Sequence, residues 1–274
     1  MKPKHEFLPV WLLFLPVAWC TCLELRAVDP PPRPLIQAHA HNDYEHARPL
    51  LDALDAGFCS VEADIYLVDS KLLVAHDRSG VEPERTLEAL YLEPLRQRAR
   101  MNGGRVYAGG PEVSLLIDLK EPAKKIYPAL RRALEEYSDI LSSFDGDKET
   151  VRAVRVILTG ERTTNMLAGE ATRYASIDGT LAELDSGLPA DLVPWISSRW
   201  GISFSWNGDG AMPQEQRLKL QQLVAKAHQQ GRRVRFWGSP DKLPFWKELL
   251  FEKVDLINTD NLKGVQDFLA AQPH

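Results

Sequence analysis

Cysteine is scarce in this chain of 274 residues, which contains three. Cys20 and Cys22 lie within the first 27 residues, so removal of that segment would leave Cys59 as the remaining thiol, with no partner for an intramolecular disulfide. Cys59 lies in an apolar run, which is typical of a small buried residue rather than a nucleophile. The composition therefore excludes a disulfide-stabilised scaffold.

The chain also lacks a basic surface and a long apolar segment in its body. Its formal net charge is −5, and its lysines and arginines are scattered rather than gathered in a stripe. Because tracking a phosphate backbone requires such a stripe, we expect no nucleic-acid partner. No run after the N-terminal region approaches the length of a membrane-spanning helix.

The N-terminus differs in composition from the rest of the chain. Lys2 and Lys4 precede the apolar run FLPVWLLFLPVAWC, and a Pro-rich stretch follows. This layout predicts a signal peptide over residues 1–27, a linker over 28–34 and a barrel domain over 35–272. We therefore expect an exported protein, periplasmic or secreted, with anchoring by an uncleaved leader or by lipidation of a leader cysteine as the lesser alternative.

From residue 35 onward, short β-like runs alternate with helical patterns. The expected strands are LIQAHA (35–40), FCSVEADI (58–65), KLLVAHD (71–77), VSLLIDLK (113–120), AVRVILTG (153–160), TRYASID (172–178), GISFSW (201–206), RRVRFWG (232–238) and VDLINTD (254–260). The expected helices are 48–57, 86–100, 122–137, 214–231 and 261–269. A hairpin-like turn is expected at Asp69 and Ser70. About eight strands, most followed by helices, predict a single-domain α/β fold of the TIM-type (β/α)8 barrel, whose active site lies at the carboxyl ends of the strands.

The pair His39 and His41 at the end of the first strand raises the possibility of a zinc hydrolase of the amidohydrolase kind. A catalytic zinc ion usually has three protein ligands, so two imidazoles are too few. The chain has seven histidines, and none of them ends an expected strand in the second half. The further ligands that this chemistry requires are therefore missing, and the amidohydrolase interpretation remains a minor alternative.

Carboxylates at two strand ends predict a different metal site. Glu62 and Asp64 project to one face of their strand because side chains alternate with period two. Asp118, at the end of the next long strand, can converge on them. Ionised acids inside apolar runs are costly unless they are paired or metal-bound. Three carboxylates and no soft ligand suit Mg²⁺ or Ca²⁺.

Three histidines are candidates for proton transfer at such a site, because the imidazole pKa lies near working pH. His76 is the expected general acid. Either His41 or His39 is the expected general base; we prefer His41 because it lies further into the loop, and His39 then orients it.

Other polar and aromatic residues follow the same strand ends. Lys120 faces the same way as Asp118, and either contacts a substrate phosphate or neutralises the acidic cluster as a structural ion pair. Trp206 and Trp237 either form a pocket wall for a head group or close the top of the barrel.

The order His…Glu-x-Asp…His-Asp…Asp-x-Lys, in the segments HNDY, SVEAD, LLVAHD and LLIDLK, resembles the superfamily of glycerophosphodiester phosphodiesterases and phosphatidylinositol-specific phospholipases C. It looks most like a branch that includes the fungal altered-inheritance-of-mitochondria proteins. The resemblance covers Leu35 to about Lys120. It implies a TIM-type barrel, a divalent metal held by Glu62, Asp64 and Asp118, and catalysis by a histidine pair that includes His76.

Residues and resemblance together predict a metal-dependent phosphoric diester hydrolase. The expected substrate is a small-molecule or lipid head-group phosphodiester of the glycerol or inositol type, so contact with a membrane surface would come through the substrate. A catalytically inactive barrel that binds a phosphorylated head group is the alternative. Neither the oligomeric state nor the choice between a cyclic and a hydrolysed product follows from the sequence.

Overall fold

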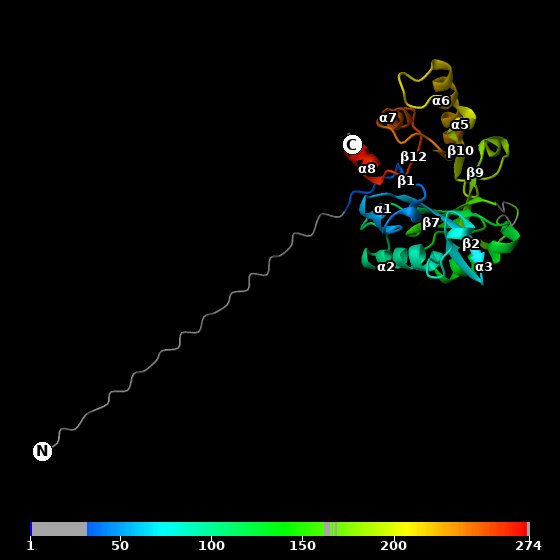
Figure 1. Ribbon diagram of the computed structural model, residues 1–274. Helices are drawn as coiled ribbons and strands as arrows, with labels where there is room; N and C mark the ends of the chain where they lie inside the picture. The colour runs from blue at the N-terminus through cyan, green and yellow to red at the C-terminus, as the bar shows by residue number, and fades with distance from the viewer. Residues whose placement is uncertain (2–31, 162–164, 166, 168, 273–274) are drawn as a thin grey trace. The chain divides into compact units, whose positions relative to one another are not determined.

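The computed structural model describes residue 1, residues 32–161, 165 and 167, and residues 169–272. Within these, eight parallel strands close a barrel in the order β1-β2-β4-β7-β9-β10-β11-β12, with β12 pairing back to β1 (Figure 1). The strands are β1 (Ala38–Ala40), β2 (Ser60–Val68), β4 (Val113–Leu119), β7 (Val154–Gly160), β9 (Ala175–Gly179), β10 (Trp195–Arg199), β11 (Arg233–Trp237) and β12 (Leu256–Thr259). The predicted single-domain TIM-type barrel is confirmed.

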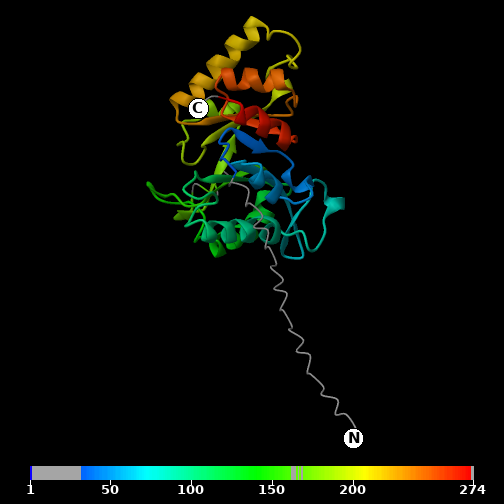
Figure 2. The ribbon, with the colours of Figure 1, turned by 90° about the vertical axis from the view of Figure 1, so that its left-hand side faces the viewer.

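Helices cover the barrel on both sides. They are α1 (Leu51–Asp55), α2 (Glu93–Met101), α3 (Ala123–Glu136), α5 (Trp200–Ser203), α6 (Gln214–Gln229), α7 (Leu243–Phe251) and α8 (Leu262–Ala270). Figures 1 and 2 show α6, α7 and α8 on one side of the barrel, and α2 and α3 on the other. None of the described helices is both long and apolar enough to cross a bilayer. The N-terminal residues expected to form a signal peptide lie outside the described part, apart from residue 1.

Helix α8 illustrates how sequence pattern directs a helix onto the barrel. Its buried residues Leu262, Val265 and Phe268 recur every three positions and so share one face. The side chain of Asn261 accepts a hydrogen bond from the backbone N–H of Gly264 at 2.9 Å, which satisfies a donor at the helix start. The apolar face packs against β1 and β12, where the barrel closes.

The strand β3 (Lys71–Val74) is antiparallel to β2 and lies outside the closed ring. The turn between them has Asp69 and Ser70 in the left-handed region, with φ of 47° and 65°, as two-residue hairpin turns require. The predicted turn is therefore confirmed, but KLLV is a hairpin arm and not a barrel strand. The backbone N–H of Ala75 donates to the carbonyl of Asp64 at 3.2 Å, which brings the following His76 to the barrel mouth.

Short elements fill the connections. A three-stranded sheet comprises β5 (Ser143–Asp145), β6 (Lys148–Thr150) and β8 (Thr172–Arg173). Short turns of helix are η1 (Asp43–Glu45), η2 (Arg78–Gly80), η3 (Glu88–Leu92) and η4 (Leu181–Asp185). The hydroxyl of Thr86 accepts a hydrogen bond from the N–H of Ala89 at 3.1 Å, as expected for the cap of the helical segment that leads into α2.

The prediction of a strand over residues 201–206 is wrong. Residues 200–203 form α5, and the strand is β10, which precedes it. The alternation of Ile202, Phe204 and Trp206 resembles the pattern of a strand. In the structure the rings of Trp200 and Phe204, four residues apart as in one helical turn, stack with their centres 4.3 Å apart. The two serines of β10 gave it a weak strand signal in the sequence, because β-branched and aromatic residues carry most of that signal.

Asp43 anchors the loop that follows β1 from a fully buried position. Its Oδ2 accepts hydrogen bonds from the N–H of Leu50 at 2.5 Å and the hydroxyl of Tyr91 at 2.9 Å. Leu50 has a positive φ of 64°, a conformation that needs such support. Burial raises the pKa of Asp43 to about 7.

This raised pKa predicts a pH dependence of stability. In the unfolded chain Asp43 ionises near the ordinary aspartate pKa of 3.8, whereas in the folded chain it keeps its proton to about pH 7. Its contribution to the free energy of unfolding therefore falls as pH rises between these values. At pH 8, Asp43→Asn should have a free energy of unfolding about 1 kcal/mol or more above that of the wild type, measured by urea unfolding. At pH 5 this gain in the free energy of unfolding should be smaller. Asp267→Asn, on the surface of α8, is the control, and an equal gain at both pH values would contradict the prediction.

Candidate active site

A cavity of about 310 Å³ opens at the carboxyl ends of the barrel strands. It collects most of the side chains that the sequence analysis selected. Those that line it are His41, Glu62, Asp64, His76, Asp118, Lys120 and Trp237. His39 lies beneath it, and Trp206 lies elsewhere.

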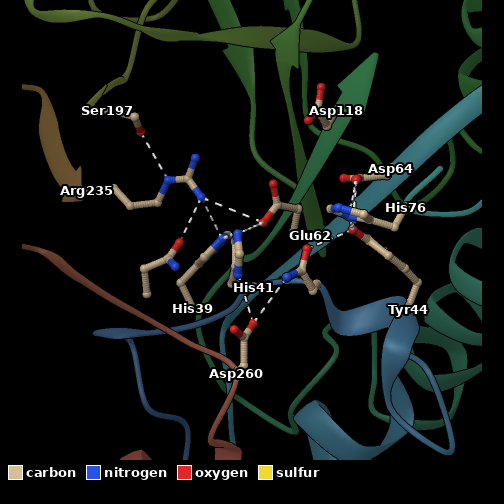
Figure 3. A network of polar contacts seen from close by, with 12 residues as sticks. His39, His41, Tyr44, Glu62, Asp64, His76, Asp118, Ser197, Arg235 and Asp260 are labelled. Atoms are coloured by element: carbon tan, nitrogen blue, oxygen red, sulfur yellow. Dashed lines mark hydrogen bonds and ion pairs between the residues drawn. The ribbon is translucent and has the colours of Figure 1, made fainter. Parts of the chain in front are cut away.

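Three carboxylates converge at the centre of this cavity (Figure 3). Asp64 on β2 and Asp118 on β4 lie opposite each other in the strand register, and Glu62 lies two residues before Asp64 on the same face. Oxygen atoms of the three side chains all lie within 4.8 Å of one another, and this is the group of possible metal ligands in the described part of the chain. Gly160 at the end of β7 leaves space for Asp118, because a side chain there would collide with its carboxylate.

Two of these acids differ in how their surroundings shift their pKa values. Burial raises the pKa of Glu62, but contact with His39 and the charges of Arg235 and His41 outweigh it and hold that pKa at about 2. Burial, with the charges of Glu62 and Asp118, raises the pKa of Asp64 to about 6. The buried Oε2 of Glu62 accepts no hydrogen bond from the described residues. A hard divalent cation fits this donor set.

Lys120 lies against two of these acids. Its ammonium is 2.8 Å from Asp64 Oδ2 and 2.7 Å from Asp118 Oδ2, and both contacts raise its pKa although burial opposes this. The ion pair considered for this lysine is thus present in the structure. The same lysine lines the cavity.

His41 has the geometry of an oriented base. Its Nδ1 lies 2.8 Å from Asp260 Oδ1, so Nδ1–H donates to the carboxylate and Nε2 carries the lone pair. Nε2 lies 3.9 Å from Glu62 Oε2, on the side of the acids. Burial lowers the pKa of His41, but the hydrogen bond to Asp260 and the charge of Glu62 outweigh it and raise that pKa above its usual value.

His39 is enclosed in the barrel with no exposed surface. Its Nε2 lies 2.9 Å from a guanidinium nitrogen of Arg235, which can only donate, so Nε2 accepts and Nδ1–H donates to Ser60 Oγ at 2.7 Å. Burial and the charge of Arg235 lower the pKa of His39 to about 4. Both ring nitrogens are therefore engaged, which leaves His39 without a free site for a substrate proton.

Arg235 on β11 joins this buried layer across the barrel. Its guanidinium donates to four acceptors on four other strands: Ser197 Oγ at 3.1 Å, His39 Nε2 at 2.9 Å, Asn258 Oδ1 at 3.0 Å and Asp178 Oδ2 at 3.2 Å. It also lies 3.9 Å from Glu62 Oε2. A buried charge with these partners is held in one position.

His76 reaches the cavity from the hairpin and is about half exposed. Its Nδ1 lies 3.0 Å from the hydroxyl of Tyr44, which also lies 2.7 Å from Asp64 Oδ2. Because the phenol has one proton and the carboxylate is the stronger acceptor, Tyr44 donates to Asp64 and His76 Nδ1–H donates to Tyr44. This chain orients the ring of His76.

The two tryptophans have different surroundings. Trp237 at the end of β11 is 40% exposed and lines the cavity. Trp206 is buried, stacks on Phe245 at 5.3 Å, and donates from Nε1 to the carbonyl of Asp209 at 3.2 Å. The structure therefore does not bring Trp206 to the pocket wall, because its ring packs into the core beside α7.

Sequence reasoning did not assign roles to Tyr44, Arg235 or Asp260. Tyr44 belongs to the segment HNDY, but its position beside His76 depends on the hairpin. Arg235 could have been suspected, because it lies two residues before Trp237 and so shares its face. Asp260 directly follows the last strand, and only closure of the barrel brings it to His41.

Comparison with known families decides the family. The profile of the AIM6-like phosphodiesterase domain matches residues 32–178, more than half of the chain. The chain belongs to this family. It is 32% identical over 270 residues to altered inheritance of mitochondria protein 6 of Eremothecium gossypii, covering 85% of this chain and 69% of that protein. It is 29% identical over 265 residues to the homolog of that protein in Arthroderma benhamiae, covering 85% and 83%.

Solved structures share the fold of this AIM6-like domain. A glycerophosphodiester phosphodiesterase from Agrobacterium tumefaciens superposes with a TM-score of 0.52 at 15% identity, covering 86% of this chain and 100% of that one. A second glycerophosphodiester phosphodiesterase, from Parabacteroides distasonis, superposes with a TM-score of 0.51 at 12% identity, covering 88% of this chain and 99% of that one. At these identities the likeness supports the barrel fold alone.

The prediction of an exported protein is wrong. The relatives that align over most of this AIM6-like chain are fungal proteins named for the inheritance of mitochondria, including that of Saccharomyces cerevisiae, and none of these names points to export. An apolar run after two lysines is a compositional signal, and composition does not separate secretory leaders from other apolar N-terminal segments.

The buried position of Arg235 predicts a large effect of its removal. Arg235→Met removes the cation beside Glu62 and Asp178, so it should lower the free energy of unfolding by about 3–5 kcal/mol. Arg235→Lys keeps the charge but has fewer donors, so its free energy of unfolding should lie between those of the wild type and Arg235→Met. Urea unfolding measures both, with Arg132→Met on the exposed face of α3 as the control. Wild-type stability of Arg235→Met would contradict the role of this guanidinium.

Proposed function

We propose that the chain is a metal-dependent phosphoric diester hydrolase in which His41 is the general base and His76 the general acid. The observation that carries the proposal is the convergence of Glu62, Asp64 and Asp118 beside His41. The Nδ1 atom of His41 is hydrogen-bonded to Asp260. Membership of a phosphodiesterase-domain family supports the reaction class.

The proposed metal ligands are Glu62, Asp64 and Asp118. Their hard oxygen donors favour Mg²⁺ or Ca²⁺. A bound divalent ion supplies neutralisation of the non-bridging phosphate oxygens. Lys120, the cation beside these acids, is assigned to a phosphate oxygen, and Trp237 to the wall that contacts the substrate alcohol.

Proton transfer is assigned to the two histidines that line the cavity. His41 Nε2 takes the proton from the nucleophile, either water or a neighbouring hydroxyl of the substrate, and Asp260 stabilises the resulting imidazolium. His76, oriented by Tyr44, gives a proton to the leaving alcohol oxygen. His39 has no part in proton transfer, and positions the buried layer beneath the site.

The proposed substrate is a glycerol- or inositol-type phosphodiester, either a small molecule or a lipid head group. The cavity of about 310 Å³ accommodates a small head group but not an entire lipid, whose chains would remain outside.

The first test is turnover by the full chain. Hydrolysis of a diester with a 4-nitrophenyl leaving group should require Mg²⁺ or Ca²⁺, stop on chelation and return on metal addition. Glu62→Gln should lose both metal binding, measured by calorimetry, and turnover. If the metal-bound chain hydrolyses no member of a broad panel of diesters, the enzyme proposal fails and a head-group-binding barrel is favoured.

The same assay tests the role of His76. His76→Ala should keep metal binding but lose about 100-fold or more of its turnover of a diester with an alkyl leaving group. The loss with 4-nitrophenol should be much smaller, because nitrophenolate leaves without a proton. His228→Ala, on α6, is the control. Equal losses for both leaving groups would contradict a general-acid role.

The pair His41 and Asp260 predicts a shift in the pH profile. As a base His41 must be neutral, so activity rises as pH passes the pKa of His41. Asp260→Asn removes a contact that raises this pKa, and the acid limb should therefore move to lower pH, while the maximal rate falls because the ring is less well oriented. The measurement is kcat/KM from pH 5 to 9. An acid limb that stays in place would contradict the assignment of His41.

A further inference from the structure

An arginine lies beside Trp237, the tryptophan that lines the cavity. Arg199 on β10 and Trp237 on β11 are opposite each other in the register, and the guanidinium carbon lies 5.9 Å from the centre of the indole ring. Two residues earlier on these strands, Ser197 and Arg235 are hydrogen-bonded inside the barrel. Because side chains alternate along a strand, Arg199 and Trp237 occupy the next layer of the same interior face.

The backbone after Trp237 leaves space for this pair. Gly238 has a φ of 59°, and a side chain there would have its first carbon 3.3 Å from Cγ of Arg199. A glycine at this position therefore lets the arginine lie beside the indole without steric conflict.

Arg199 differs from Lys120 and Arg235, the two cations that line the cavity. Lys120 is paired with two carboxylates and Arg235 is bonded within the barrel. Arg199 is exposed, and its guanidinium makes no hydrogen bond or ion pair with another described residue. The three carboxylates that line the cavity, Glu62, Asp64 and Asp118, would repel any negative charge on a substrate beyond the scissile phosphate.

We propose that Arg199 and Trp237 bind a second anionic group of the substrate, a carboxylate or another phosphate, outside the scissile phosphodiester. The inference rests on the proposed function and specifies its substrate class. A guanidinium offers a fork of donors that matches either anion, and the indole supplies an apolar contact for the carbons that carry it. The same positive charge disfavours a trimethylammonium head group, which would otherwise bind the face of a tryptophan.

Two matched diesters test this preference by turnover. One is phenyl 4-nitrophenyl phosphate, and the other carries a carboxylate on the phenyl ring. The wild-type chain with Mg²⁺ should favour the carboxylated diester in kcat/KM by roughly five- to tenfold, the range of an exposed charge-assisted contact. Arg199→Gln should abolish the preference and Arg199→Lys should keep part of it, while Arg132→Gln on α3 should leave it unchanged. A preference that survives in Arg199→Gln would overturn the proposal.

Binding separates this proposal from that of catalysis. Calorimetry with the two corresponding phosphonates, in which carbon replaces the leaving-group oxygen so that the scissile bond is absent, should show the same preference in Kd for the wild type and its loss in Arg199→Gln. A trimethylammonium analogue should bind more weakly than the uncharged parent. Equal affinity of the wild type for both phosphonates would overturn the proposed anion site. If the wild type prefers the carboxylated phosphonate in binding but hydrolyses no diester, the proposed function would be overturned and the proposed anion site would still be supported.

Discussion

The structure depends on one buried cation. The guanidinium of Arg235 lies where eight strands enclose it, and it donates to side chains of β1, β9, β10 and β12 while it lies beside Glu62 of β2. A barrel centre without this charge could not hold two ionisable acids away from water, since the desolvation of each would exceed what packing returns. With it, Glu62 stays ionised, through contact with His39 and the charge of Arg235, and His39 stays neutral, through burial and the same charge.

Three layers of side chains follow from this arrangement. The lowest is apolar and contains Leu116, Ile157, Trp195 and Leu256, which plug the barrel. The middle layer is the network around Arg235, which is polar and buried, with Arg235 itself bordering the cavity. The upper layer holds the groups that reach the cavity. The strand period of two residues places each layer above the last, so a rigid core fixes the directions of the groups that face the substrate.

The division between the middle and upper layers explains why two histidines separated by one residue differ so strongly. His39 lies in the middle layer, where burial and Arg235 hold its pKa near 4. His41 lies in the upper layer, where a carboxylate from the last strand raises its pKa. A chemically identical pair thus provides one structural ring and one ring with a free nitrogen. The acids beside the second ring could hold a metal ion, and Lys120 balances part of their charge.

The sequence alone determined the barrel and the positions of its acids. Alternating strands and helices predict the fold because each element must bury one face, and the spacing of Glu62 and Asp64 places both on one side of a strand whatever the surroundings. The tertiary structure decided what depends on contacts between distant segments. Strand β10 carried too few strand-forming residues to be recognised, and Trp206 is buried by α7. The difference between His39 and His41 comes from residues 196 and 219 positions further along the chain. Periodicity is a local property that a single segment carries, whereas the pKa and exposure of a side chain are set by neighbours that only the closed barrel brings together.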